Sequence, residues 1–121
     1  MARIITLKEN RDFRRLYGRG KCFASPALVT YVTKNREGRC RVGITASKKI
    51  GNAVQRNRAR RVITAAYRAA LPRITGGYDF VFVARTRTRL VRSNEVLSTM
   101  LSHLAKANCL ATEQNDEKTA D

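Results

Sequence analysis

Residues 52–71 constrain the fold more than any other segment, because helical periodicity divides them into two chemically opposed faces. At about 100° per residue, small apolar side chains gather on one side of the helix: Ala59, Val62, Ile63, Ala66 and Ala70. The other side collects polar and cationic side chains: Asn57, Arg60, Arg61, Thr64 and Arg68, with Arg56 and Arg58 at its margins. A fold containing this helix must cover the apolar side closely, as a sheet does, and leave the cationic side to solvent or a partner.

The remaining periodicities predict the sheet that this helix covers. "YDFVFVA" at 78–84 is nearly all apolar and is typical of a central strand, with Asp79 interpreted as a turn residue before it. "CRVGITAS" at 40–47 alternates as a strand does. "CFASPALVTYV" at 22–32 predicts two short strands, or one strand bent at Pro26.

Two further helices complete the predicted order. The first is expected near the start, where Thr6 and Glu9 have the spacing of a capping box, and the last follows Ser93 or Asn94 as its cap. The order α-β-β-β-α-β-α predicts a single small α+β domain, a four-stranded sheet packed with helices. We place the domain at residues 1–108 and expect 109–121 to form a disordered acidic and polar tail.

The charge of the chain points to a polyanionic partner. The 121 residues carry a net charge of +16, and residues 1–112 alone hold 24 basic and 5 acidic side chains. No apolar run approaches the roughly 20 residues of a membrane span, and the start lacks a secretory pattern, so we expect a cytoplasmic protein with no membrane contact. Three widely spaced cysteines without a C-x-x-C pair predict no metal site.

The cationic helix face favours RNA among the polyanions. Like charges along a helix cost stability, and cations near its N-terminus oppose the helix dipole, so a purely solvated face is the poorer interpretation. Arginine forks match phosphates, and Asn57 can hydrogen-bond a base or a 2′-hydroxyl of a folded RNA. Lys48 and Lys49 lead into a glycine-containing turn whose backbone N–H groups can also attract phosphate.

At these residues the sequence resembles the bacterial ribonuclease P protein family, whose hallmark is a K-K-x-G-N-A-V-x-R-N-R run. The run stands complete at residues 48–58 and is followed by Arg60 and Arg61. "LKENRDFRRLYGRGK", "RVGITASKK" and "YDFVFVAR" also resemble family segments, so the likeness spans roughly residues 7–106. The resemblance implies a fold like domain 2 of ribosomal protein S5, with a left-handed β-α-β crossover. It also implies a protein subunit that helps a catalytic RNA remove the 5′ leader of precursor tRNA.

The resemblance implies two sets of site residues. Contacts with the RNA subunit would come from the motif and from the cationic face: Lys48, Lys49, Asn52, Arg56, Asn57, Arg58, Arg60, Arg61 and Arg68. The single-stranded leader would lie in a cleft lined by Phe13, Tyr17 and Tyr31. From the residues alone, core packing is the favoured interpretation of these three rings, and only the resemblance places base stacking above it.

The polypeptide itself shows no catalytic pattern. Hydrolysis of a phosphodiester usually needs clustered carboxylates with metal ions or paired histidines, and the carboxylates here are scattered. The resemblance assigns the chemistry to the RNA subunit, which would hold most of the Mg²⁺. The expected partners are this RNA and precursor tRNA, with no obligate protein partner. The alternative is a non-catalytic ribosomal-type RNA-binding protein or RNA chaperone.

Overall fold

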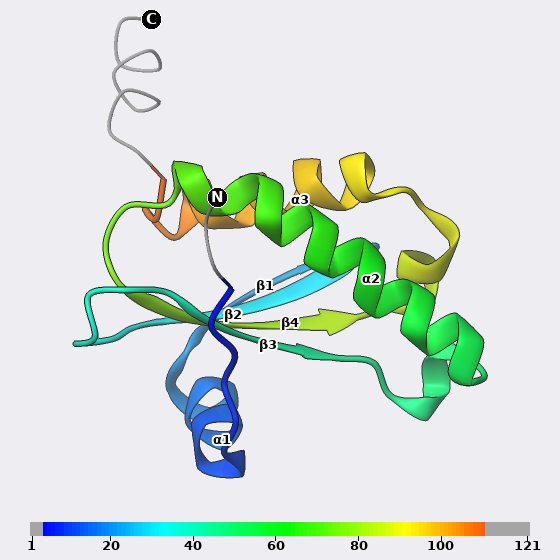
Figure 1. The fold of residues 1–121 in the computed structure, drawn as a ribbon, viewed down its shortest axis with the longest axis horizontal. Helices are drawn as coiled ribbons and strands as arrows, with labels where there is room; N and C mark the ends of the chain where they lie inside the picture. Colours follow the sequence, from blue (N-terminus) through cyan, green and yellow to red (C-terminus); the bar gives the residue numbers. More distant parts are fainter. Residues whose placement is uncertain (1–3, 111–121) are drawn as a thin grey trace, which may run out of the picture.

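The computed structural model describes residues 4–110 and has the predicted element order (Figure 1). Its sheet has the strand order β1-β2-β4-β3, formed by β1 (Lys21–Ser25), β2 (Leu28–Lys34), β3 (Arg41–Thr45) and β4 (Tyr78–Ala84). Pairing is antiparallel between β1 and β2 and between β2 and β4, but parallel between β3 and β4. The prediction of an α+β domain with a four-stranded sheet is therefore confirmed.

The three α-helices of residues 4–110 cover both faces of the sheet. α2 (Ala53–Ala70) connects the parallel strands β3 and β4, and it packs beside α3 (Ser93–Lys106) on one face. α1 (Asn10–Arg19) lies alone across the other face (Figure 1). Short 3-10 helices precede and follow α2 and precede α3, at Lys48–Ile50, Leu71–Arg73 and Thr86–Leu90.

The main core lies between the sheet and the α2–α3 layer, as the apolar face of the central helix predicts. Ala59, Ile63 and Ala66 bring the backbone of α2 close to β4, where Phe80 and Phe82 are fully buried. Tyr67 contacts both phenylalanine rings, at centroid distances of 6.0 and 5.6 Å. Aromatic pairs of this kind add about 0.5–1.5 kcal/mol beyond the burial of their surface.

A smaller core holds α1 on the opposite face. Successive strand residues point to opposite sides, so Val81 and Val83 of β4 face α1 while Phe80 and Phe82 face α2. Leu16 of α1 and Leu7 of the preceding segment are buried against Val81. The segment before α1 also pairs with the edge strand β3, through Leu7 N–H and Val42 N–H, each donating to a backbone carbonyl at 2.8–2.9 Å.

Three local predictions need correction. α1 begins after Glu9 with no side-chain cap, because Thr6 instead forms a β-bridge with Val42. Arg92 occupies the N-cap position of α3, and neither Ser93 nor Asn94 does. The predicted tail begins too early at residue 109, since Cys109 and Leu110 are both buried.

The chain after α3 is held by backbone pairing that the sequence does not signal. Thr75 N–H donates to the carbonyl of Cys109 at 2.9 Å, and Ile74 forms an antiparallel bridge with Leu110. The domain boundary predicted at residue 108 therefore moves to at least residue 110. The rest of the predicted tail, 111–121, lies outside the described residues.

His103 is the one histidine of the chain, and it is buried. Its Nδ1 lies 2.8 Å from the hydroxyl of Thr30 in β2, and its Nε2 lies 2.8 Å from the hydroxyl of Ser25 at the end of β1. Burial, and after it the charge of Lys106, lowers the pKa of His103. The neutral ring thus ties α3 to the first hairpin through two hydroxyl groups.

We predict that the domain loses stability as pH falls from about 7.5 to about 5.5, the range in which an unfolded histidine with a pKa near 6.5 takes up a proton. The folded-state pKa of His103 is lowered, so the unfolded chain binds more protons in this window. The free energy of unfolding should decline by at most about 1.4 kcal/mol per pH unit for this one proton. Urea unfolding at several pH values measures the decline, and His103→Gln should flatten it. If the unfolding free energy of His103→Gln fell equally steeply with pH, His103 would not be the group responsible.

Candidate RNA interface

The turn before α2 is shaped by the motif residues themselves. Ser47 accepts a hydrogen bond from the N–H of Lys49, which opens the short 3-10 helix Lys48–Ile50. Asn52 then caps α2: its Oδ1 accepts from the N–H of Gln55, and Gln55 Oε1 accepts from the N–H of Asn52, both at 2.9 Å. This capping box satisfies two of the otherwise unpaired donors at the helix start.

Gly51 has to be glycine for two physical reasons. Its φ is +145°, a conformation that other residues rarely adopt. A Cβ at this position would also lie 1.9 Å from Gln55 Oε1, the atom that closes the capping box. The glycine therefore lets Lys48 and Lys49, both exposed, lead directly into a capped helix.

The cationic face of α2 is exposed and partly fixed in place. Arg61, Arg68 and Asn57 are exposed. Arg58 Nε donates to the carbonyl of Arg89 at 2.9 Å, and Arg60 Nη1 donates to Asn57 Oδ1 at 3.0 Å. These acceptors are neutral, so they orient the guanidinium groups without cancelling their charge.

Arg56, at the margin of this face, is oriented in the same way. Its Nη1 donates to the carbonyl of Gly51 at 2.8 Å, so the arginine closes over the turn that precedes it. Asn52 contributes its side-chain oxygen to the cap, and its remaining amide donors lie at the exposed start of the helix. The structure thus brings the predicted residues of 48–61 together on one surface, and Arg68 extends that surface along α2.

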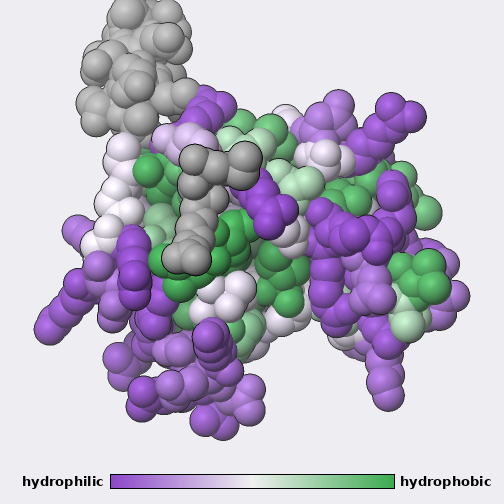
Figure 2. Space-filling model, viewed as in Figure 1, coloured by the Kyte–Doolittle hydropathy of each residue, from purple (hydrophilic) through white to green (hydrophobic). Residues whose placement is uncertain are grey.

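No carboxylate of residues 4–110 forms an ion pair with an arginine of α2. The ion pairs of this region join arginines of α1 and β3 to Glu9, Asp12 and Asp79, and join Arg87 to Glu95 of α3. Figure 2 shows hydrophilic side chains gathered over the N-terminal half of α2 and over α1. Several guanidinium groups that are held close together without counter-charges attract a polyanion strongly. The surface is therefore suited to phosphate groups.

The three predicted aromatic residues gather where α1 crosses the sheet. Tyr17 of α1 and Tyr31 of β2 meet edge to face, with ring centroids 5.0 Å apart and planes at 82°. Tyr17 is 45% exposed, which rules out a core role for this ring. Phe13 packs over Gly43, where an added Cβ would lie 2.4 Å from the phenylalanine ring. Phe13 and Tyr31 are half-buried beside the small core, so they support a surface on which Tyr17 is open.

A cavity of about 480 Å³ lies between Phe13 and the cationic face of α2. Phe13 and Gly43 line it on the α1 side, and Thr64 and Arg68 line it on the α2 side. Apolar residues of β3 and of the N-terminal segment lie between them. An RNA segment at Phe13 would therefore lie next to one bound along α2.

Asp79 is the site residue that sequence reasoning missed. It is fully buried inside β4, on the α1 face, and its carboxylate accepts from Arg15 Nη2 at 2.6 Å, from Arg41 Nη2 at 2.8 Å and from Asn35 Nδ2 at 2.8 Å. Burial alone would raise the pKa of Asp79, but the hydrogen bonds from Arg41, Asn35 and Arg15 hold it below its ordinary value. The sequence did carry a signal for this buried position. Asp79 starts an apolar strand and stands two residues before Val81, so both side chains point to the same face of the sheet.

The described residues offer little for hydrolytic chemistry. Within 4–110 no group of three or more His, Cys, Asp or Glu side chains is placed to hold a metal ion. The buried carboxylate of Asp79 is engaged by arginines, and His103 lies among hydroxyl groups inside the core. In the same part of the chain, no helix is long and apolar enough to cross a membrane.

Comparisons with known proteins agree with this geometry. The family model described as ribonuclease P matches residues 1–108. The "Ribonuclease P protein component" of Clostridioides difficile is 49% identical over 84 residues, which cover 69% of this chain and 74% of the relative. The protein of the same name from Clostridium beijerinckii is 42% identical over 118 residues, covering 92% of this chain and 94% of the relative.

A solved structure confirms the fold. The ribonuclease P protein of Staphylococcus aureus superposes with a TM-score of 0.77 at 29% identity, covering 90% of this chain and all of that one. The structure and its charge define a small α+β RNA-binding domain. The chain belongs to the ribonuclease P protein family, whose members are accessory subunits of a ribonucleoprotein enzyme.

Proposed function

We propose that the exposed arginine face of α2, together with Lys48, Lys49 and Asn52, binds the catalytic RNA subunit. The observation that carries this assignment is the absence, within residues 4–110, of any carboxylate paired with the arginines of α2. Arg56, Arg58 and Arg60 are held by neutral acceptors, and Arg61 and Arg68 are exposed for phosphate contact. Because these side chains are already oriented in the free protein, they lose little conformational entropy when RNA binds.

The second part of the proposal concerns the substrate, precursor tRNA. Its single-stranded 5′ leader stacks on Tyr17, which Tyr31 contacts from β2, while Phe13, one turn earlier on α1, packs against the small core. Stacking on an aromatic face accepts every base, and this suits a subunit that must bind leaders of many sequences. The protein in this way holds the leader beside the RNA subunit, and the RNA subunit cleaves it.

The proposal leaves the chemistry to the RNA. In this proposal the Mg²⁺ ions of the enzyme are held mainly by the RNA subunit, and residues 4–110 present no group of three or more His, Cys, Asp or Glu side chains for a metal ion. The contribution of the protein is positive charge, which reduces repulsion between the two RNAs. Its place of action is the cytoplasm, where tRNA is made and processed in bacteria.

The decisive experiment mixes the protein with its cognate RNA subunit and precursor tRNA at low Mg²⁺. We predict faster 5′ cleavage than with the RNA alone, because the protein adds affinity for the leader and screens charge. Mature tRNA, which has no 5′ leader to remove, serves as the control. An unchanged cleavage rate at every Mg²⁺ concentration would favour a non-catalytic RNA-binding protein or chaperone instead.

Replacing Arg61 by Ala should weaken binding to the RNA subunit and make it less sensitive to salt. One lost phosphate contact lowers the slope of log K against log salt by about 0.7–0.9. Filter binding at several salt concentrations measures the slope, and Arg39→Ala, in the exposed turn between β2 and β3, is the matched control. Equal slopes for wild type and Arg61→Ala would contradict phosphate contact at this residue.

Replacing Tyr17 by Ala should weaken precursor tRNA binding to the holoenzyme while leaving mature tRNA unaffected. Loss of one stacked base costs about 1–3 kcal/mol, which corresponds to roughly a fivefold or greater rise in Kd. Tyr17→Phe keeps the ring and should bind like wild type. Equal losses for precursor and mature tRNA, or a large drop in folding stability, would show that the ring acts in packing and not on the leader.

A further inference from the structure

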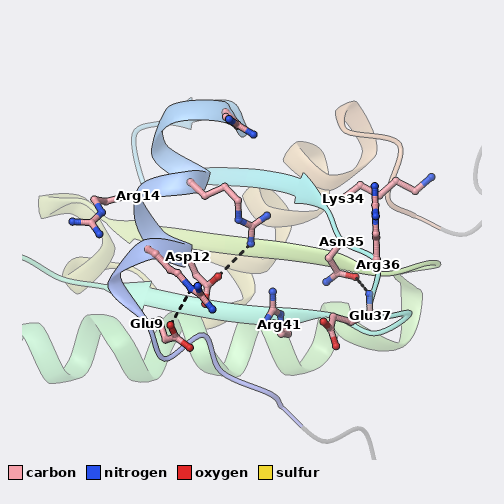
Figure 3. Close-up of a pocket in the computed structure, with 11 residues that line it drawn as sticks. Glu9, Asp12, Arg14, Lys34, Asn35, Arg36, Glu37 and Arg41 are labelled. Atoms are coloured by element: carbon pink, nitrogen blue, oxygen red, sulfur yellow. Dashed lines mark hydrogen bonds and ion pairs between the residues drawn. The ribbon is translucent and has the colours of Figure 1, made fainter.

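A second hollow lies on the other side of α1 from the aromatic residues. This cavity, of about 860 Å³, opens between α1 and the turn that joins β2 to β3 (Figure 3). It is distinct from the cationic face of α2, which lies on the opposite face of the sheet. Arginines and one lysine from three elements line it: Arg14 and Arg19 from α1, Lys34 and Arg36 from β2 and its turn, and Arg41 from β3.

The floor of the cavity is rigid. Arg15 and Arg41 both form ion pairs with the fully buried carboxylate of Asp79. Arg41 donates two hydrogen bonds to it, from Nε at 2.9 Å and from Nη2 at 2.8 Å. Asn35 of the turn completes the network. Because one carboxylate ties α1, β3 and the turn together, the two walls of the cavity are held at a fixed separation.

The rim of the cavity carries more positive than negative charge. Glu9 pairs with Arg11 at 3.0 Å, and Asp12 lies 3.6 Å from Arg15. Within residues 4–110, the cations without an ion-pair partner on the rim are Arg14, Arg19, Lys34 and Arg36, against a single unpaired carboxylate, Glu37. The electrostatic potentials of cations around a concave surface add up, so the cavity attracts a polyanion.

The helical geometry of α1 connects this cavity to the aromatic residues. Arg15 and Arg19 lie about 160° from Tyr17 around the helix axis, on the cavity side, whereas Arg14 lies only about 60° from Tyr17. Arg14 and Tyr17 are also neighbours at i,i+3, about 5–6 Å apart at Cβ. Gly18 leaves the solvent side of α1 open, since nothing lies within 4 Å of the place where its Cβ would be.

We propose that this cavity binds the phosphate backbone of leader nucleotides that lie beyond the base stacked on Tyr17. The strand crosses the solvent side of α1 at Arg14 and Gly18, and its phosphates then contact Arg19, Lys34 and Arg36. The inference rests on the proposed leader contact at Tyr17 and extends it to longer leaders. It makes α1 a ridge with base stacking on one side and phosphate binding on the other.

The test compares holoenzymes on two precursor tRNAs, with leaders of about 5 and about 15 nucleotides, lengths within the range of known single-strand sites. Wild type should bind the longer leader more tightly. Arg36→Ala should lose much of this gain, lower the salt slope for the long leader by about 0.7, and leave the short leader unchanged. Arg39→Ala is the matched control, because Arg39 lies in the same turn but does not line the cavity.

Several outcomes would overturn the inference. Equal effects of Arg36→Ala and Arg39→Ala would show only general charge attraction. A loss of RNA-subunit affinity in Arg36→Ala, with the leader-length gain intact, would assign the cavity to the RNA subunit. Failure of the proposed function itself looks different, because the wild-type protein would then fail to accelerate cleavage even of the short-leader substrate.

Discussion

The buried carboxylate of Asp79 is the interaction on which the α1 face of the molecule depends. α1 contacts the sheet through a small apolar cluster, and Asp79 adds charged hydrogen bonds from Arg15, Arg41 and Asn35. An unpaired charge at this depth would cost several kcal/mol, whereas two guanidinium groups and an amide satisfy it. The arrangement fixes the direction of α1, and through it the positions of Tyr17 on one side and of the cationic cavity on the other.

A different principle governs the α2 face. There the guanidinium groups of Arg56, Arg58 and Arg60 donate to carbonyl or amide oxygens. A neutral acceptor restricts the side chain but leaves its full charge available to a partner. A carboxylate in the same place would have stabilised the free protein and weakened RNA binding. The described part of the chain thus uses ion pairs to build its structure around α1 and avoids them where α2 is open to RNA.

The periodicity of the sequence was sufficient to predict those helices and strands whose burial follows one repeating pattern. The two-faced α2 and the apolar β4 were predicted closely, because every turn of α2 and nearly every residue of β4 carries the same signal. Asp79 and Cys109 were misjudged, because their burial depends on partners more than 30 residues away in sequence. For the same reason the residues alone favoured core packing of the aromatic rings, and only the family resemblance pointed to the leader. Only the crossing of α1 over β2 and β3 decides that Tyr17 is open while Phe13 is packed over Gly43.

The surplus of positive charge links folding to RNA binding. A net charge of +16 on 121 residues destabilises the compact state through self-repulsion, and the phosphate groups of a bound RNA reduce that repulsion. A ligand that binds only the folded state stabilises it by mass action, so RNA binding and folding reinforce each other. This coupling explains why arginines can remain unpaired on α2 and around the α1 cavity at the same time. Their cost falls on the free protein, while their benefit appears in the complex, where each phosphate contact also releases condensed counterions.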